Sequence, residues 1–191
     1  MLEGTVVART RAVRRARLSA VVAIALAAAF ATWLILRPDT ATAPIAKAVG
    51  RTSTAELTSP ARLRSLATTL SHPVYWAGPR AGMRYELTQA DGRTYIRYLP
   101  VGVATGDPRA GFLAIGSYAA PNAFAQTRAA GAQPGTVMLT LPGGGVAVYS
   151  AKRPTSVYFA YRGSDVQVEV YHPDGRAARQ LVLTRQVVPI R

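Results

Sequence analysis

Two glutamates, Glu86 and Glu169, have the residue type and sequence context that come nearest to a catalytic arrangement. Glycoside hydrolysis requires a pair of carboxyl groups, one protonated as the acid and the other ionised as base or nucleophile. Tyr75, Trp76 and Tyr158 lie close to these glutamates in the sequence and would supply an apolar platform on which sugar rings stack. An envelope glycoside hydrolase using Glu86 and Glu169 is therefore the alternative function that we carry forward.

We favour another interpretation, in which each glutamate lies on the solvated polar face of a strand and pairs with an arginine. None of the side chains is then catalytic, and the same group becomes the candidate binding surface of a noncatalytic module. The candidate binding residues are Tyr75, Trp76, Arg84, Glu86, Tyr158 and Glu169.

Other kinds of chemistry find little support in the residue types. The sequence has no G-x-S-x-G elbow, Walker loop, H-E-x-x-H or G-x-G-x-x-G motif. The absence of cysteine excludes disulfides, thiolate metal sites and a cysteine nucleophile. The two histidines, His72 and His172, both precede prolines and are too few for a histidine-rich metal cluster. We expect no enzyme activity, no cofactor and no metal site.

A membrane segment is the clearest signal in the chain. Five arginines within residues 9–17 precede an uncharged run from Leu18 to Leu36. Nineteen helical residues span about 28 Å, close to the thickness of a hydrocarbon core. Because the positive charge lies before the run, the positive-inside rule keeps residues 1–17 in the cytoplasm and exports the rest. We predict a single-pass protein of the cell membrane with an extracytoplasmic C-terminal domain.

A cleaved signal peptide is the competing interpretation of the same segment. Ala29-Phe30-Ala31 has the A-x-A form that signal peptidase prefers. However, the apolar run continues through Trp33 to Leu36, where a mature N-terminus is usually polar. An uncleaved anchor fits this continuation better, and the sequence leaves the cleavage open.

The charge balance is strongly basic, with 23 Lys and Arg against 9 Asp and Glu and a net charge of +14. Such a surface would attract anionic envelope polymers, phospholipid head groups or nucleic acid. The arginines of the exported part are scattered, without a basic arm, which favours a solvated surface. Since export also separates the domain from nucleic acid, we expect an envelope polymer or a partner protein instead.

Residues 37–58 contain Pro, Thr and Ala without apolar periodicity and predict a linker before a domain at 59–191. Ser59-Pro60 is a helix start, and two further helices are expected near 122–130 and 174–183.

Short β-branched and aromatic runs predict strands at 74–77, 83–88, 94–99, 112–118, 136–141, 146–150, 157–161 and 166–171. Strands interspersed with a few helices predict the α+β class.

An internal duplication is suggested by a shift of 83 residues, which aligns 73–93 with 156–176 without a gap. The identical pairs are Val74/Val157, Tyr75/Tyr158, Ala77/Ala160, Glu86/Glu169, Asp91/Asp174, Gly92/Gly175 and Arg93/Arg176. If the repeat is real, two strand–turn–strand units superpose and each covers the other's apolar face. Two unrelated hairpins that share common strand and turn residues are the alternative.

The stretches PVYWAG, YELT, RYLP and EVYHP resemble uncharacterised membrane-anchored proteins of high-GC bacteria. The resemblance covers residues 72–191 and implies a folded domain, but it carries no known activity, cofactor or functional residue. Our leading expectation is a noncatalytic extracytoplasmic module that binds an envelope component or a partner protein. The sequence does not indicate the ligand, the biological process or the oligomeric state.

Overall fold

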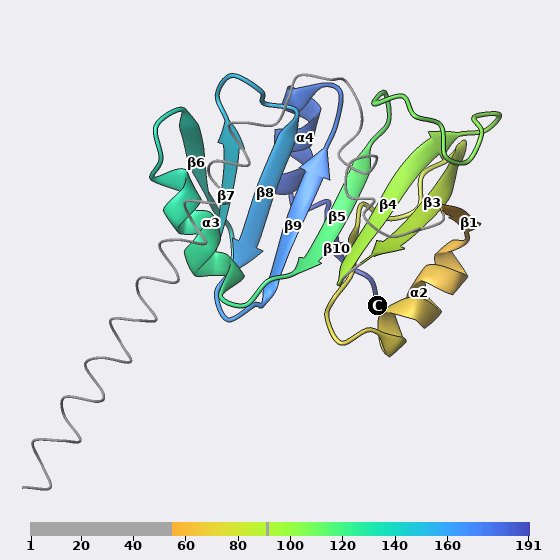
Figure 1. Cartoon of the computed structure of the whole chain (residues 1–191), viewed down its shortest axis with the longest axis horizontal. Coiled ribbons are helices and arrows are strands. Elements are labelled where there is room, and N and C mark those ends of the chain that lie inside the picture. Colours follow the sequence, from red (N-terminus) through yellow and green to blue (C-terminus); the bar gives the residue numbers. More distant parts are fainter. Residues whose placement is uncertain (1–54, 91) are drawn as a thin grey trace, which may run out of the picture. The chain divides into compact units, whose positions relative to one another are not determined.

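The computed structural model describes residues 55–90 and 92–191, and these residues form a strand-rich domain with three helices (Figure 1). The main sheet is antiparallel throughout, in the order β1 (Glu56–Thr58), β3 (Met83–Ala90), β4 (Arg93–Pro100), β5 (Ala114–Ala119), β9 (Val166–Tyr171), β8 (Ser156–Tyr161), β7 (Gly145–Ser150) and β6 (Thr136–Leu141). A separate ribbon pairs β2 (Tyr75–Trp76) with β10 (Val188–Pro189). The helices are α2 (Pro60–Thr69), α3 (Ala123–Gly131) and α4 (Gly175–Leu183). The predicted α+β class is confirmed.

Local sequence signals account for most element boundaries. Helix α2 begins with Pro60 in its first turn, and the Ser59 hydroxyl accepts a hydrogen bond from the Arg62 amide at 3.2 Å. A two-residue turn joins β3 to β4, and Gly92 there has φ of 73°, a conformation that favours glycine. Side-chain capping and turn chemistry are local, which is why the sequence predicts these boundaries.

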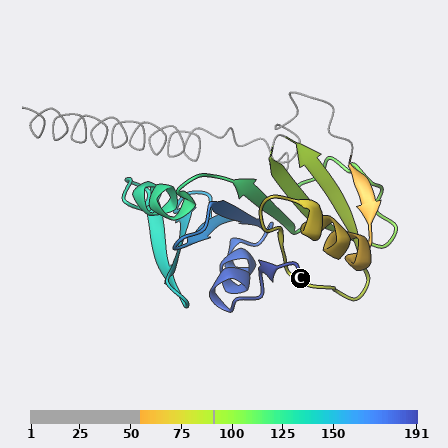
Figure 2. The same cartoon turned by 90° about the horizontal axis from the view of Figure 1, so that it is seen from below.

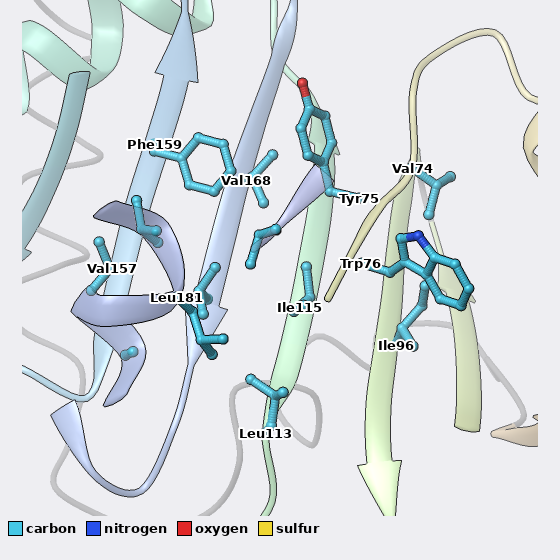
Figure 3. Close-up of a cluster of buried hydrophobic side chains, with 14 of the residues drawn as sticks. Val74, Tyr75, Trp76, Ile96, Leu113, Ile115, Val157, Phe159, Val168 and Leu181 are labelled. Carbon is cyan, nitrogen blue, oxygen red and sulfur yellow. The ribbon is translucent and has the colours of Figure 1, made fainter. Parts of the chain in front are cut away.

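One face of the main sheet, the core face, carries the hydrophobic core. It presents Leu87, Ile96, Ile115, Val157 and Phe159, all of which are buried. Helices α2 and α4 and the β2–β10 ribbon pack over these side chains. Figure 3 shows Leu181 of α4 and Tyr75 and Trp76 of β2 among them. The expected inward orientation of Leu87 is confirmed.

The opposite face of the sheet is divided between two kinds of side chain. Helix α3 packs over β7 and β8, and Figure 2 shows α3 and α4 on opposite sides of the sheet. Beyond α3, the strands β3, β4, β5 and β9 present polar and charged side chains on this face, and most of these are buried. The expectation of a solvated polar strand face is therefore wrong: Glu86, Thr88 and Glu169 are only 1%, 5% and 2% exposed.

Two further expectations concern the part of the chain before the sheet. Strand β1 lies inside the stretch predicted as a linker, because residues 56–58 pair with β3 at the sheet edge. The predicted membrane segment 18–36 and the Ala29-Phe30-Ala31 site lie outside the described residues. Within the described part of the chain, none of the helices has the length and apolar character needed to cross a bilayer.

The predicted duplication is wrong. Strands β8 and β9, in the second copy, pair with each other, whereas β2 pairs with β10 and β3 pairs with β1 and β4. The two Asp-Gly pairs also differ, because Gly92 lies in a hairpin turn while Asp174 is the N-cap of α4. The Asp174 side chain accepts the Arg176 amide at 2.8 Å, which is a capping function. The seven identities therefore reflect shared strand and turn preferences.

Candidate functional site

Tyr75 and Trp76 do not form a platform near the glutamates. Both lie on β2, are at most 8% exposed and pack in the core (Figure 3). Glu86 lies on the other face of the sheet, because its neighbour Leu87 points into this core. Their rings meet Phe159 and Tyr85 edge to face at 5.7 and 6.4 Å. These two aromatic residues stabilise the core, and their predicted place in a binding surface is corrected.

Glu86 pairs with Arg97 rather than with Arg84. Register places Glu86 directly opposite Arg97 on the neighbouring strand, and the Arg97 Nη1 atom donates to Glu86 Oε1 at 2.7 Å. Both side chains are almost fully buried: Arg97 is 5% exposed and Glu86 is 1% exposed. The Gly106 amide donates to the second carboxylate oxygen, so both oxygens of Glu86 are engaged.

Glu86 and Arg97 attach the β4–β5 loop, residues 101–113, to the opposite face of the sheet. Arg97 Nη2 donates to the backbone carbonyls of Asp107 and Arg109 at 2.8 and 3.1 Å. Arg84 donates to the Val103 carbonyl, and the Tyr171 hydroxyl donates to the Ala110 carbonyl at 2.6 Å. We refer to these residues and the backbone they hold as the Glu86 cluster.

The loop also carries a more exposed charged pair. Asp107 and Arg109 form a bidentate contact, with Arg109 Nη2 donating to Asp107 Oδ2 at 2.6 Å. These hydrogen bonds from Arg109 lower the pKa of Asp107 to about 2. The guanidinium groups of Arg97 and Arg109 both lie near the Phe112 ring, at 5.4 and 5.6 Å from its centroid.

Glu169 is the centre of a second group of side chains, the Glu169 cluster. Ser156 and Tyr158 donate their hydroxyls to Glu169 Oε1 at 2.8 and 2.9 Å, and Tyr118 donates to Oε2. The cluster draws on three strands, because Tyr118 lies on β5 and the two donors to Oε1 lie on β8. Of the predicted site residues, the structure brings together Tyr158 and Glu169.

Gly116 makes the Glu169 cluster possible. It lies on β5 directly between Tyr95 and Glu169 in the register. A Cβ at this position would lie 2.8 Å from the Tyr118 hydroxyl oxygen and 3.2 Å from the Tyr95 ring. The Tyr118 side chain therefore lies over the strand at Gly116 to reach Glu169, and this arrangement needs glycine.

Burial raises the pKa of the tyrosines around Glu169. For Tyr95, Tyr118 and Tyr171, loss of solvation is the main cause and the nearby Glu169 charge contributes in the same direction. These phenols therefore stay protonated over a wide range of pH, and those of Tyr118 and Tyr171 continue to donate to Glu169 and to the Ala110 carbonyl.

The two glutamates share the opposite face but do not form a pair. Strands β4 and β5 separate β3 from β9, and three strand spacings correspond to about 14 Å. Glycosidase carboxyl groups are about 5–10 Å apart, and both lone-pair positions of Glu169 Oε1 already accept hydroxyl groups. Among the described residues, no three His, Asp or Glu side chains group as a metal site would require.

The important residues that sequence reasoning did not single out are Arg97, Tyr118 and Gly116. Gly116 interrupts an apolar strand, which is a recognised sign of close approach by another group. Arg97 is recognisable only after the β3–β4 register is known, since that register places it opposite Glu86.

Comparisons of the chain with protein-family models, with curated proteins and with solved structures yield no match. Function is therefore inferred from the two clusters and the loop that they hold.

Proposed function

We propose that this protein is a noncatalytic, single-pass membrane module whose extracytoplasmic domain binds an acidic envelope component or partner protein through its β4–β5 loop. The N-terminal arginines and the run Leu18–Leu36 support the anchoring and the orientation. The two glutamates support a noncatalytic role, because the chain itself provides their hydrogen-bond partners.

The observation that carries the proposal is the attachment of the β4–β5 loop. Loops longer than about 12 residues without their own secondary structure are uncommon in compact domains and usually functional. This loop has thirteen residues between Pro100 and Ala114. It is held by the buried side chains of Glu86 and Arg97 and by the half-buried Tyr171. A loop fixed on a rigid sheet loses little entropy when it binds a partner.

The exposed groups of the loop indicate the chemistry of the partner. Val101 is 72% exposed, and the Arg109 side chain is 68% exposed. Residues 38–191 carry 17 basic and 8 acidic residues, a net charge of +9. Two of the eight acidic side chains, Glu86 and Glu169, are buried, so arginine dominates the exposed charge. An acidic partner complements this surface.

Export is tested with the full-length chain carrying a reporter after Arg191. A reporter that is active only outside the cytoplasm should be active, and the intact chain should stay in the membrane fraction. Activity of a cytoplasm-specific reporter would refute the orientation. A shortened species beginning at Thr32 would show that the Ala29-Phe30-Ala31 site is cleaved.

Recognition by the loop is tested with a photo-crosslinking amino acid placed at Val101 in the anchored chain. The same group at Val188, which is 42% exposed on β10, is the control. We expect a discrete adduct from position 101, and this adduct should weaken when Arg109 is replaced by Ala. Equal labelling from both positions, or labelling unaffected by Arg109→Ala, would exclude the loop as the binding surface.

A further inference from the structure

Strand β6 leaves one edge of the main sheet open. Within the described part of the chain it pairs with β7 alone, and it forms the end of the sheet at the left of Figure 1. On its outer side the Thr136 amide already donates to the Gln133 carbonyl at 3.2 Å, and the other outward backbone groups of the strand can pair with another strand. At the other end of the sheet, β1 has only three residues, and Glu56 there pairs with Arg62.

The open edge lacks the features that normally prevent strand pairing. Natural edge strands are blunted by charge, proline, bulges or short length. Strand β6, TVMLTL, has six residues with no charge and no proline. Its register with β7 runs one to one from Thr136 to Leu141, without a bulge. Met138 is 49% exposed on this strand.

Contacts within the domain fix the position of strand β6 on both faces. A Cβ on Gly131 of α3 would lie 2.8 Å from the Met138 sulfur, so the helix lies directly against this side chain. On the core face, Leu139 packs against the hydrophobic core. Strand β6 is therefore fixed from both faces while its outer edge stays open.

We propose that β6 pairs with β6 of a second copy of this chain, in antiparallel orientation about a twofold axis at Met138. Residues that face each other across an antiparallel pair have numbers with a constant sum. Centring on Met138 places Thr136 opposite Thr140 of the second copy, and Val137 opposite its Leu139. Thr–Thr pairs are favourable cross-strand neighbours, and the Val137–Leu139 pair places apolar side chains against each other.

Strand β6 itself adds no charge repulsion between two copies. The chain has a net charge of +14, so two copies repel each other across most of their surfaces. Strand β6 carries no charge, and the centred register opposes hydroxyl to hydroxyl and apolar to apolar side chains. The pairing depends on neither the proposed ligand nor the proposed anchoring.

The absence of cysteine from the chain allows a covalent test on the purified full-length protein. Met138→Cys places two thiols opposite each other on the axis, within disulfide reach. Val101→Cys is the control, since it is more exposed and lies on the β4–β5 loop. Under mild oxidation, we expect about tenfold more covalent dimer from Met138→Cys than from Val101→Cys, because only paired edges hold their Cα atoms within about 7 Å.

The register is tested with Thr136→Cys and Thr140→Cys. Each variant alone should remain monomeric on a nonreducing gel, whereas an equal mixture of the two should form a mixed dimer. Introducing Met138→Lys into both should abolish the mixed dimer, while Val101→Lys in both should not, with circular dichroism confirming the fold of each.

Three results would overturn the proposal. The first is the absence of dimer from Met138→Cys, and the second is a yield equal to that of Val101→Cys. The third is dimer from Thr136→Cys alone at the level of the mixture. A second copy that associates through another surface would give the first or second result, and pairing of β6 in another register would give the third.

Discussion

The buried Glu86–Arg97 pair is the residue-scale feature that connects the sheet to its longest loop. Removing two charges from water is costly, and their attraction offsets that cost only when further hydrogen bonds complete the site. Here the Gly106 amide and the carbonyls of Asp107 and Arg109 supply those bonds. The pair therefore requires the loop, and the loop is held by the pair.

Replacing Arg97 tests this mutual dependence. Arg97→Met leaves the Glu86 carboxylate buried without its cation, and we expect the free energy of unfolding to fall by about 3–5 kcal/mol. Arg62→Met is the matched control, because it removes an exposed pair with Glu56, and it should change stability by less than about 0.5 kcal/mol. Urea denaturation measures both, and equal effects would mean that the buried pair does not hold the loop.

Gly116 provides a second residue-scale prediction. Gly116→Ala places a methyl group against Tyr118, and overpacking of this kind should lower the free energy of unfolding by about 1–3 kcal/mol. Gly111→Ala is the control, because a Cβ added at that position would meet nothing within 4 Å. In a Tyr118→Ala background, the cost of Gly116→Ala should largely disappear, as a double-mutant cycle by denaturation would measure. An unchanged cost there would show that Tyr118 is not the obstructing group.

At the scale of elements, β3 has one apolar and one polar face, and both are buried along its centre. Leu87 packs in the core, whereas Thr88 points to the opposite face, where its hydroxyl has no hydrogen-bond partner in the described structure. A buried polar atom without a partner lowers stability, so the two neighbouring positions should respond in opposite ways to apolar substitution.

Two substitutions in β3 measure this difference. Leu87→Ala should lower the free energy of unfolding by about 2–5 kcal/mol, because it leaves a cavity. Thr88→Val keeps the shape and removes the unpartnered hydroxyl, so stability should stay the same or rise by up to about 1 kcal/mol. A clear loss of stability from Thr88→Val in thermal or chemical denaturation would show that the Thr88 hydroxyl has a partner.

For the whole molecule, stability should fall as the pH rises through the alkaline range. Burial raises the pKa of several tyrosines above the ordinary value near 10: Tyr75, Tyr95, Tyr98, Tyr118 and Tyr171. The unfolded chain releases these protons at about pH 10, while the folded chain retains them. Because the unfolded state then binds fewer protons, the free energy of unfolding must fall as pH rises above 10.

Few other groups interfere with this prediction, since only 2 of the 23 basic residues are lysine and arginine stays charged. Urea denaturation from pH 7 to 11 should show nearly constant stability up to about pH 9 and a decline beyond pH 10. Tyr118→Phe removes one of the groups and should make the decline shallower. Constant stability between pH 10 and 11 would contradict the burial of these phenols.

The sequence by itself determined most elements of this domain, with β1 and β10 as the exceptions. Side-chain alternation, the Ser59-Pro60 start and the glycine-containing turns are local signals, and the strands and helices form close to where those signals place them. The same alternation predicted which face of β3 points into the core, because Tyr85 and Leu87 are the apolar residues of the alternating pattern, and both lie in the core.

Only the tertiary structure decided what happens to the polar side chains. Alternation separates the two faces of a strand, but it does not reveal whether a loop or a neighbouring strand covers the polar one. Glu86 is buried because register brings Arg97 opposite it and the β4–β5 loop closes over both, and Glu169 because hydroxyl groups from β5 and β8 meet there. These contacts join different strands of the sheet, and a buried charge is tolerated only where such partners converge.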